Sequence, residues 1–402
     1  MFKLDKNLIK GSLILLIAFN IYNALNFFFQ FSMARMLSIV DYGILATLFS
    51  IIYVSGVFSE SIQTVMMKYS ASEKNPGIIK NLLKRSLKKG VSIYLILLAI
   101  YLIIAIFLSP LLKINYLLLA LTGIVLYSAF LIPINRGVML GKKMFKSLSG
   151  NLILESSSKL ILAILFVLLG FQVYGALFAT IIAVSLAFLF SFPSLKKILK
   201  SKESFADVRE IYSYSLPVFL ITISIILFFS IDIIIAKIVF DETTAGAYAI
   251  ASILAKTIFW GTQPISKAMF PLSVENGDNK SQKRNILLNA CAFLFVCIFA
   301  ALVLFYLFPD LLIKIFSGKE IADSSSILVY VGISMALLAF TNLSLLYKVS
   351  CGKTKGAALF LVFVLLEVLL LLYFSANIVQ FSLALIASSV TFLIGSLLLL
   401  RE

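Results

Sequence analysis

The chain has 402 residues, of which 61% are hydrophobic and only 13% are charged, and its formal net charge is +16 at pH 7. Soluble domains are about 45–50% apolar and about 25% charged, so this composition excludes a soluble fold and makes lipid the expected solvent. The chain contains no histidine and three cysteines, which excludes His-based triads, His-ligated metals and haem, and we expect the thiols to be free.

The apolar residues fall in helix-length runs, not in alternating segments of roughly ten residues, which favours a helical bundle over a β-barrel. In chain order the predicted transmembrane helices cover residues 8–34, 41–69, 91–109, 114–138, 149–170, 174–194, 213–238, 244–271, 286–308, 325–349, 356–375 and 378–400. We therefore predict an all-α membrane protein with about twelve transmembrane helices.

Most of the 34 Lys and Arg residues lie in alternate connections between these runs. The positive-inside rule places those connections and both termini in the cytoplasm, as expected for a multi-pass protein of the plasma membrane. The basic excess therefore indicates orientation in a membrane and no nucleic-acid partner. The segment 80–89 is basic and amphipathic, and we expect it either on an anionic inner leaflet or in a solvated loop.

The two halves of the sequence look related at an offset of about 203 residues. The order is Ala34-Arg35 and then Asp41-Tyr42-Gly43 in the first half, and Ala236-Lys237 and then Ala245-Gly246 in the second. Six helices are an even number, so two such copies share one orientation. This pattern predicts two six-helix lobes, residues 1–200 and residues 201–402.

Polar side chains recur at helical spacing in three of the predicted helices. They are Asn20, Asn23, Asn26 and Gln30 in the first, Glu60, Gln63 and Lys68 in the second, and Ser252, Lys256, Gln263 and Lys267 in the eighth. Steps of three or four residues place each set on one helix face. The three stripes either line a hydrated cavity or form hydrogen bonds between helices.

Ionisable residues within the membrane are costly, so each is a functional hypothesis. Glu155 and Lys159 form an i,i+4 pair in the favourable order, with a role either in helix packing or in coupling. Asp232 and Glu367 have no local partner in the sequence, so each is protonated, paired across helices or facing water. Together with Glu60, these four residues are the candidates for ion coupling.

Signatures of catalysis are missing from the sequence. There is no DxD motif, the Gly352-Lys353-Thr354 sequence lacks the first glycine of a phosphate-binding loop, and no connection is long enough for a soluble catalytic domain. We expect no enzyme activity, no catalytic residue and no metal or cofactor site. A membrane-embedded glycan-modifying enzyme is disfavoured because such enzymes usually need large extramembrane loops.

The stretch Phe31–Ser38, followed by Asp41-Tyr42-Gly43, resembles the first external loop of polysaccharide-export flippases. Gly141-Lys142 and Gly352-Lys353 are similar to the positions that follow the fourth and tenth helices in that group. These flippases belong to the multidrug/oligosaccharidyl-lipid/polysaccharide exporter superfamily, which also contains the MATE transporters. The resemblance implies two six-helix lobes around a central cavity that opens alternately to each side of the membrane.

The resemblance also implies a substrate, namely an oligosaccharide on a polyprenyl diphosphate carrier. Because family cavities are typically cationic, it implies that Lys256 attracts the diphosphate, with Lys68 and Lys267 near the inner mouth, while H⁺ or Na⁺ is the coupling ion. The alternative is a cation-coupled antiporter of drugs or other small molecules with the same fold. Glu60 and Asp232 fit that alternative, whereas Lys256 does not.

Overall fold

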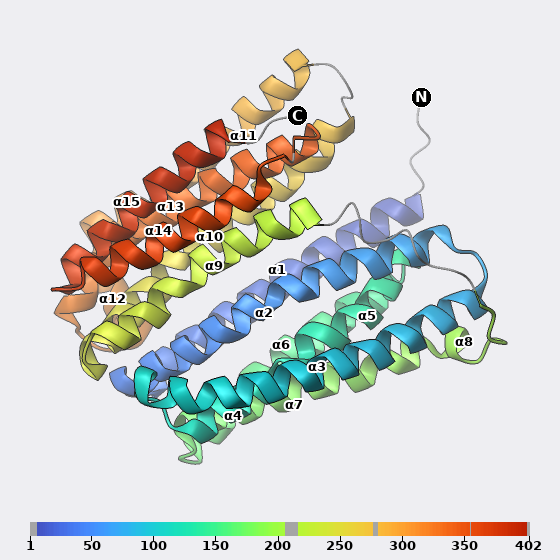
Figure 1. The fold of residues 1–402 in the computed structure, drawn as a ribbon, viewed down its shortest axis with the longest axis horizontal. Coiled ribbons are helices and arrows are strands. Elements are labelled where there is room, and N and C mark those ends of the chain that lie inside the picture. The colour runs from blue at the N-terminus through green and yellow to red at the C-terminus, as the bar shows by residue number, and fades with distance from the viewer. Residues whose placement is uncertain (1–5, 206–215, 276–279, 354, 400–402) are drawn as a thin grey trace. The chain divides into compact units, whose positions relative to one another are not determined.

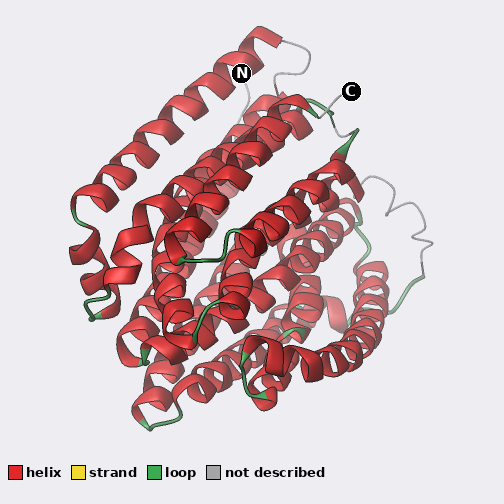
Figure 2. Cartoon of the chain, turned by 60° about the vertical axis from the view of Figure 1, so that its left-hand side comes forward, coloured by secondary structure: helices red, strands yellow, loops and turns green. Residues whose placement is uncertain are grey.

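The computed structural model describes residues 6–205, 216–275, 280–353 and 355–399. Helices joined by short loops make up these residues (Figure 2). Within them, ten helices are long and apolar enough to cross a membrane, and α10 and α14 occupy the places predicted for the eighth and eleventh spans. The predicted all-α membrane fold is confirmed.

The chain divides into two compact units (Figure 1), and the first comprises the described parts of residues 1–37 and 51–212. Within it, α6 packs along both α1 and α7, while α3 packs on α4, α5 and α8. Its helices are α1 (Lys6–Met36), most of α2 (Ile39–Ser72), α3 (Pro76–Leu112), α4 (Tyr116–Val125), α5 (Tyr127–Gly141), α6 (Phe145–Leu168), α7 (Gln172–Ser194) and α8 (Lys196–Leu199).

The second unit comprises the described parts of residues 38–50 and 213–402, so it includes the first residues of α2. Here α13 packs against α10, α11 and α15, and α14 packs against α9 and α15. Its other helices are α9 (Leu216–Val239), α10 (Glu242–Glu275), α11 (Lys280–Leu307), α12 (Pro309–Ser317), α13 (Ala322–Ser350), the short 3₁₀ helix η2 (Ala357–Leu359), α14 (Phe360–Tyr373) and α15 (Ile378–Leu398).

Two details refine the predicted pattern. The predicted span 114–138 corresponds to one candidate membrane span, Tyr116–Gly141, which is divided at Leu126 into the helices α4 and α5. The basic segment 80–89 is not a loop, because it lies within the 37-residue helix α3. That helix starts early because the Asn75 side chain accepts a hydrogen bond from the Gly77 amide and Pro76 occupies the first turn, where its missing N–H costs nothing.

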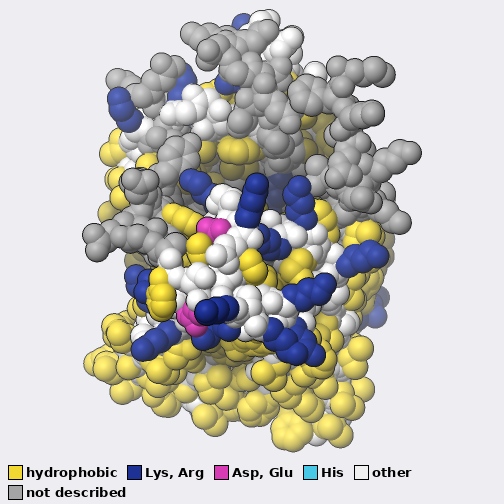
Figure 3. Space-filling view, turned by 90° about the vertical axis from the view of Figure 1, so that its right-hand side faces the viewer, with side chains coloured by type: hydrophobic (Ala, Val, Ile, Leu, Met, Phe, Trp, Pro, Cys, Tyr) yellow, Lys and Arg dark blue, Asp and Glu magenta, His cyan; other side chains and the backbone are white. Residues whose placement is uncertain are grey.

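The basic start of α3 also makes polar contacts with the segment that follows α8. Lys80 Nζ donates to the Ser201 carbonyl oxygen, and Lys84 Nζ lies 2.7 Å from a carboxylate oxygen of Glu203. Hydrogen bonds from Lys84 and from Asn81 hold the pKa of the Glu203 carboxyl below its ordinary value. Figure 3 shows a face of the molecule on which Lys and Arg side chains gather with few acidic residues among them.

The Asp-Tyr-Gly element has a packing role in the second unit. Ser38 and Asp41 cap α2 reciprocally, since the Ser38 hydroxyl accepts from the Asp41 amide and donates to the Asp41 carboxylate. Tyr42 is fully buried and packs edge-on against Phe316. A Cβ atom on Gly43 would lie 2.8 Å from the Cα atom of Gly246, so the two glycines of the related segments touch each other.

We expect the substitution Gly246→Ala to destabilise the protein by about 1–3 kcal/mol, the usual cost of an extra group in a packed interior. Its Cβ would lie 2.2 Å from the Ile39 carbonyl oxygen, a backbone atom that cannot rotate away. Gly261→Ala in the same helix is the matched control, because no atom lies within 4 Å of its Cβ. Thermal unfolding in detergent measures both, and equal midpoints for Gly246→Ala and wild type would contradict this packing.

Candidate functional site

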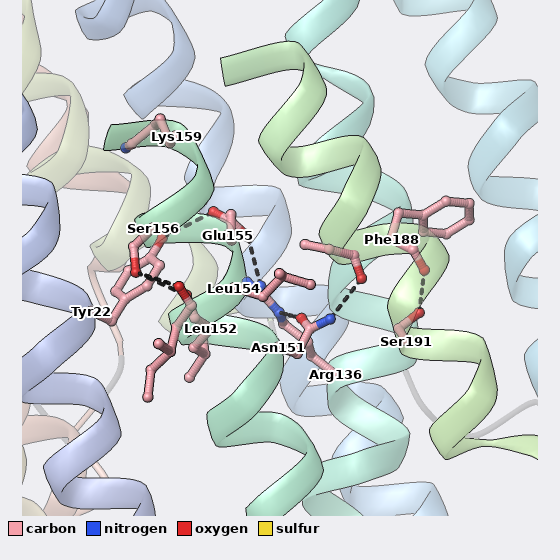
Figure 4. Close-up of polar contacts among 12 residues, drawn as sticks. Tyr22, Arg136, Asn151, Leu152, Leu154, Glu155, Ser156, Lys159, Phe188 and Ser191 are labelled. Carbon is pink, nitrogen blue, oxygen red and sulfur yellow. Dashed lines mark hydrogen bonds and ion pairs between the residues drawn. The ribbon is translucent and has the colours of Figure 1, made fainter. Parts of the chain in front are cut away.

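A buried polar network connects α1, α5, α6 and α7 in the first unit (Figure 4). At its centre Arg136 of α5 donates through Nε to Asn151 Oδ1 at 2.8 Å and through a terminal guanidinium nitrogen to a Glu155 carboxylate oxygen at 2.6 Å. The Asn151 side-chain amide in turn donates a hydrogen bond to the Ala187 carbonyl oxygen of α7, which connects this helix to the network. Arg136 and Glu155 therefore neutralise each other where an unpaired charge would be costly.

Helix α1 contributes two polar side chains to the same network. The Tyr22 hydroxyl donates to the other carboxylate oxygen of Glu155 at 3.3 Å, and Lys159 Nζ donates to Asn26 Oδ1. The ammonium of Lys159 also lies over the ring of Phe29, 4.7 Å from its centroid, in a cation–π contact. Arg136, Glu155 and Lys159 thus bring two cations and one carboxylate together.

Glu155 has an ion-pair partner that the sequence did not predict. The sequence suggested Lys159, four residues along the same helix, and the structure adds Arg136 of α5, whose guanidinium pairs with the carboxylate at 2.6 Å. Arg136 lies near the end of the predicted span 114–138, so the positive-inside rule counted it among the cytoplasmic charges. The structure shows it buried, with its guanidinium directed into the unit.

A second cluster lies inside the second unit, around Asp232 of α9. One carboxylate oxygen accepts from Lys256 Nζ at 2.8 Å, and the other accepts from the Tyr248 hydroxyl at 3.1 Å and from the Ser252 hydroxyl at 2.7 Å. The three donors are four residues apart in α10, so they share one face of that helix. The side chains of Asp232 and Lys256 are 0% and 1% exposed, which makes this pair more deeply buried than Arg136–Glu155, at 11% each.

Glu367 of α14 is the third ionisable residue of this cluster. It is fully buried, and neither of its carboxyl oxygens has a hydrogen-bond partner among the described residues. It interacts electrostatically with both Asp232 and Lys256. Of the three alternatives left open for Asp232, the structure shows the pair across helices. Tyr248, which sequence reasoning missed, extends the predicted stripe on α10 by one step.

The remaining stripe residues differ in exposure. Asn20, Asn23, Glu60, Lys68 and Lys267 are exposed, Asn26, Gln63 and Gln263 are half-buried, and Gln30 is buried. Asn20 and Asn26 each donate to a backbone carbonyl oxygen of α1 itself, four residues earlier. The exposed members of these stripes are available to a ligand, whereas Lys256 already has its anionic partner.

Comparison with known proteins places the chain in a family. A family profile described as "Polysaccharide biosynthesis protein" matches residues 32–326, well over half of the chain. The chain belongs to this family. It is also similar to a protein of Methanocaldococcus jannaschii described as an uncharacterized membrane protein, with 27% identity over 98% of each chain.

Solved structures with the same fold are MATE and related transporters. A MATE protein in complex with MaD5 has a TM-score of 0.68 at 17% identity, and an outward-facing multidrug resistance MATE transporter has 0.67 at 16%; each match covers 98% of this chain and 94% of the other. A Pyrococcus furiosus transporter of the same superfamily, described as having a binding pocket of reverse polarity, has a TM-score of 0.58 at 17% identity over 98% and 92%. Family and fold together make this family member a multi-pass membrane protein with the fold of these transporters.

We expect Glu155→Gln to cost about 3–5 kcal/mol of stability, because it leaves the Arg136 guanidinium buried without an anionic partner. The double variant Arg136→Met/Glu155→Leu should recover most of this loss, since it removes both charges. Lys84→Met is the control, since it breaks an ion pair at the surface and should change stability little. Thermal unfolding in detergent measures all three, and a Glu155→Gln protein as stable as wild type would contradict the role of the network.

Proposed function

We propose that this protein is a transporter that moves a polyprenyl-diphosphate-linked oligosaccharide, a precursor of cell-surface polysaccharide, across the plasma membrane by alternating access. The observation that carries the proposal is the pair of buried cations, Arg136 and Lys159, that lie with Glu155 in the polar network of the first unit. A cation in an apolar interior is costly and is stabilised when an anion binds beside it. A diphosphate is such an anion, and its oxygens accept charge-assisted hydrogen bonds.

Lys159 is better suited to hold the diphosphate than Lys256, to which the family resemblance assigned the role. Lys256 is almost fully buried and its charge is balanced by Asp232 at 2.8 Å. Lys159 donates to a neutral amide, that of Asn26, and its ammonium lies over the ring of Phe29. A diphosphate oxygen replacing Asn26 as acceptor would exchange a neutral partner for an anionic one, which favours binding.

We assign recognition of the glycan to polar side chains of α1 and α2 in the same unit. Asn20 and Asn23 are exposed on α1, and Glu60 and Gln63 lie on the part of α2 that belongs to the same unit. Amides and carboxylates supply the donors and acceptors that sugar hydroxyls need. Lys68 and Lys267, both exposed, would assist entry of the anionic head group, as their places near the ends of α2 and α10 suggest.

We also propose that the basic face in Figure 3 and both termini lie in the cytoplasm, as the distribution of Lys and Arg predicts. A green fluorescent protein fused to the C-terminus is then fluorescent in cells, and alkaline phosphatase fused there is inactive. The opposite pair of results would reverse the orientation.

Replacing Lys159 with Met should reduce the translocation of polyprenyl-diphosphate-linked oligosaccharide in proteoliposomes at least about tenfold, because a hydrogen bond to a charged group contributes about 1.5–3 kcal/mol. Lys146→Met is the matched control, since Lys146 is an exposed lysine of the same helix α6. Translocation is measured as the fraction of glycan that becomes accessible to a glycosidase outside the vesicles.

A second substrate separates binding of the diphosphate from general damage. The same glycan on a polyprenol without phosphate should move slowly in wild type, and Lys159→Met should leave that rate unchanged. Equal losses for both substrates would indicate a structural role for Lys159. A wild-type protein that moves neither substrate would contradict the proposed function.

The alternative function, cation-coupled antiport of drugs or other small molecules, is favoured by the two buried acidic groups of the second unit, Asp232 and Glu367. Both carboxyl groups are fully buried, however, and a cationic drug would have to displace Lys256. We therefore expect cells that produce this protein to retain cationic dyes as strongly as cells with the empty vector. Dye efflux that is abolished by Asp232→Asn would favour the antiporter instead.

A further inference from the structure

The start of α3 carries exposed cations at the edge of the apolar surface of the first unit. Helix α3 has 37 residues and is about 55 Å long, whereas the hydrocarbon core of a bilayer is about 30 Å thick. Its exposed large apolar side chains begin at Val91. Lys88 and Arg85 precede Val91 by about 5 Å and about 9 Å along the helix axis. Because the head-group layer on each side of the core is about 5–7 Å thick, these two exposed side chains can reach lipid phosphates.

The short helix α8 adds two more exposed cations to the same end of the unit. The exposed large apolar side chains of α7 end with Phe190, and Lys196 and Lys197 follow in α8. Helix α8 packs beside the start of α3 (Figure 1), and its Ile198 shares an apolar core with Leu83 of α3. The basic residues of the two helices therefore belong to one surface.

The segment that follows α8 is held along the first turns of α3. The Ser204 amide donates to the Gly77 carbonyl oxygen at 3.3 Å. Both carboxylate oxygens of Glu203 accept hydrogen bonds at 2.7 Å, one from Asn81 and the other from Lys84. Glu203 is thus neutralised by Lys84, and the other cations of this surface keep their attraction for anions.

The same segment presents an aromatic side chain among these cations. Phe205 is 74% exposed, and the guanidinium carbon of Arg85 lies 5.5 Å from the centroid of its ring. The positive-inside rule explains an excess of charge on one side of a membrane, but it does not explain an exposed phenyl ring. Cations beside an exposed apolar side chain are typical of surfaces that lie in the membrane interface, where the ring enters the acyl boundary.

We propose that the exposed cations of α3 and α8, together with Phe205, form a docking surface for the head groups of anionic phospholipids. The cations are Arg85, Lys88, Lys196 and Lys197. Phosphate oxygens accept charge-assisted hydrogen bonds from guanidinium and ammonium groups, and each basic residue near an anionic leaflet adds to the attraction. A lipid bound by both helices joins α8 to α3 and stabilises this end of the first unit.

The level of the cations selects a lipid over a soluble anion. A lipid phosphate is held in the head-group layer by its acyl chains, whereas a soluble anion pays for its own immobilisation there. Phe205 also needs an apolar neighbour, which acyl chains supply and a soluble polyanion does not. The surface acts in this way whatever substrate the protein moves.

Titration of the full-length protein in detergent micelles tests the surface. Native mass spectrometry should show that phosphatidylglycerol binds at least about tenfold more tightly than phosphatidylcholine with the same acyl chains. It should also raise the thermal unfolding midpoint more. In 1 M NaCl the difference should fall, because the Debye length shrinks from about 8 Å to about 3 Å. Equal binding of the two lipids overturns the proposal, and so does equal stabilisation by soluble glycerol phosphate or polyglutamate.

A pair of double variants locates the surface. Lys88→Gln/Lys197→Gln should weaken the binding of phosphatidylglycerol about tenfold or more, because it removes two cations near the head groups. Lys283→Gln/Arg284→Gln is the matched control, since it removes the same charge from the start of α11 in the second unit. Its effect should stay below about twofold. Equal losses in the two double variants would show attraction by net charge alone and overturn the site.

Phe205 is tested by its own pair of substitutions. Phe205→Ser should weaken the binding of phosphatidylglycerol several-fold, whereas Phe205→Trp should retain it, because an indole ring also enters the interface. The side chain is exposed, so neither change disturbs the packed interior. Wild-type affinity in Phe205→Ser would contradict insertion of this ring. The comparison of two lipids in wild type needs no substitution and decides the proposal even if a variant fails to fold.

Discussion

The cost of placing an ionised group in an apolar, water-poor interior governs how this molecule is built. Each such group must find a counter-ion, a set of hydrogen bonds or a proton within its own unit. In the first unit Arg136 and Glu155 form an ion pair that links α5 to α6. In the second unit the ion pair of Asp232 and Lys256 links α9 to α10, and two hydroxyl groups of α10 donate hydrogen bonds to the Asp232 carboxylate.

The predicted repeat of the two halves can be compared with the positions of glycine and of charge in the structure. Helices α2 and α10 each have a glycine near their start, and Gly43 and Gly246 lie against each other inside the second unit. Helix α2 begins in that unit and continues in the first, so this contact holds the first residues of α2 within the second unit. The polar residues are not kept, since the acid–base pair joins α5 to α6 in one unit and α9 to α10 in the other.

The sequence was sufficient to predict the elements and insufficient to predict their partners. Hydropathy and helix length predicted the ten helices of the described residues that are long and apolar enough to cross a membrane. They could do so because in lipid the backbone must satisfy its own hydrogen bonds and helices must span a fixed thickness. The partners of Glu155 and Asp232 lie 19 and 24 residues away on other helices. No periodicity within one helix contains that information. Arg136 was missed because charge next to an apolar run looks like a helix end, whereas Tyr248 could have been found by extending the four-residue step of Ser252 and Lys256 towards the start of α10.

The two buried clusters differ in composition. Arg136 and Lys159 lie with Glu155 in the first unit, whereas Asp232 and Glu367 lie with Lys256 in the second. An anion that binds beside the first cluster adds a partner for its cations, so it stabilises those conformations in which the cations remain accessible. Binding changes the conformation only to the extent that the ligand interacts differently with the two conformations. The proposed substrate would therefore act on this protein through the same ion pairing that stabilises the fold.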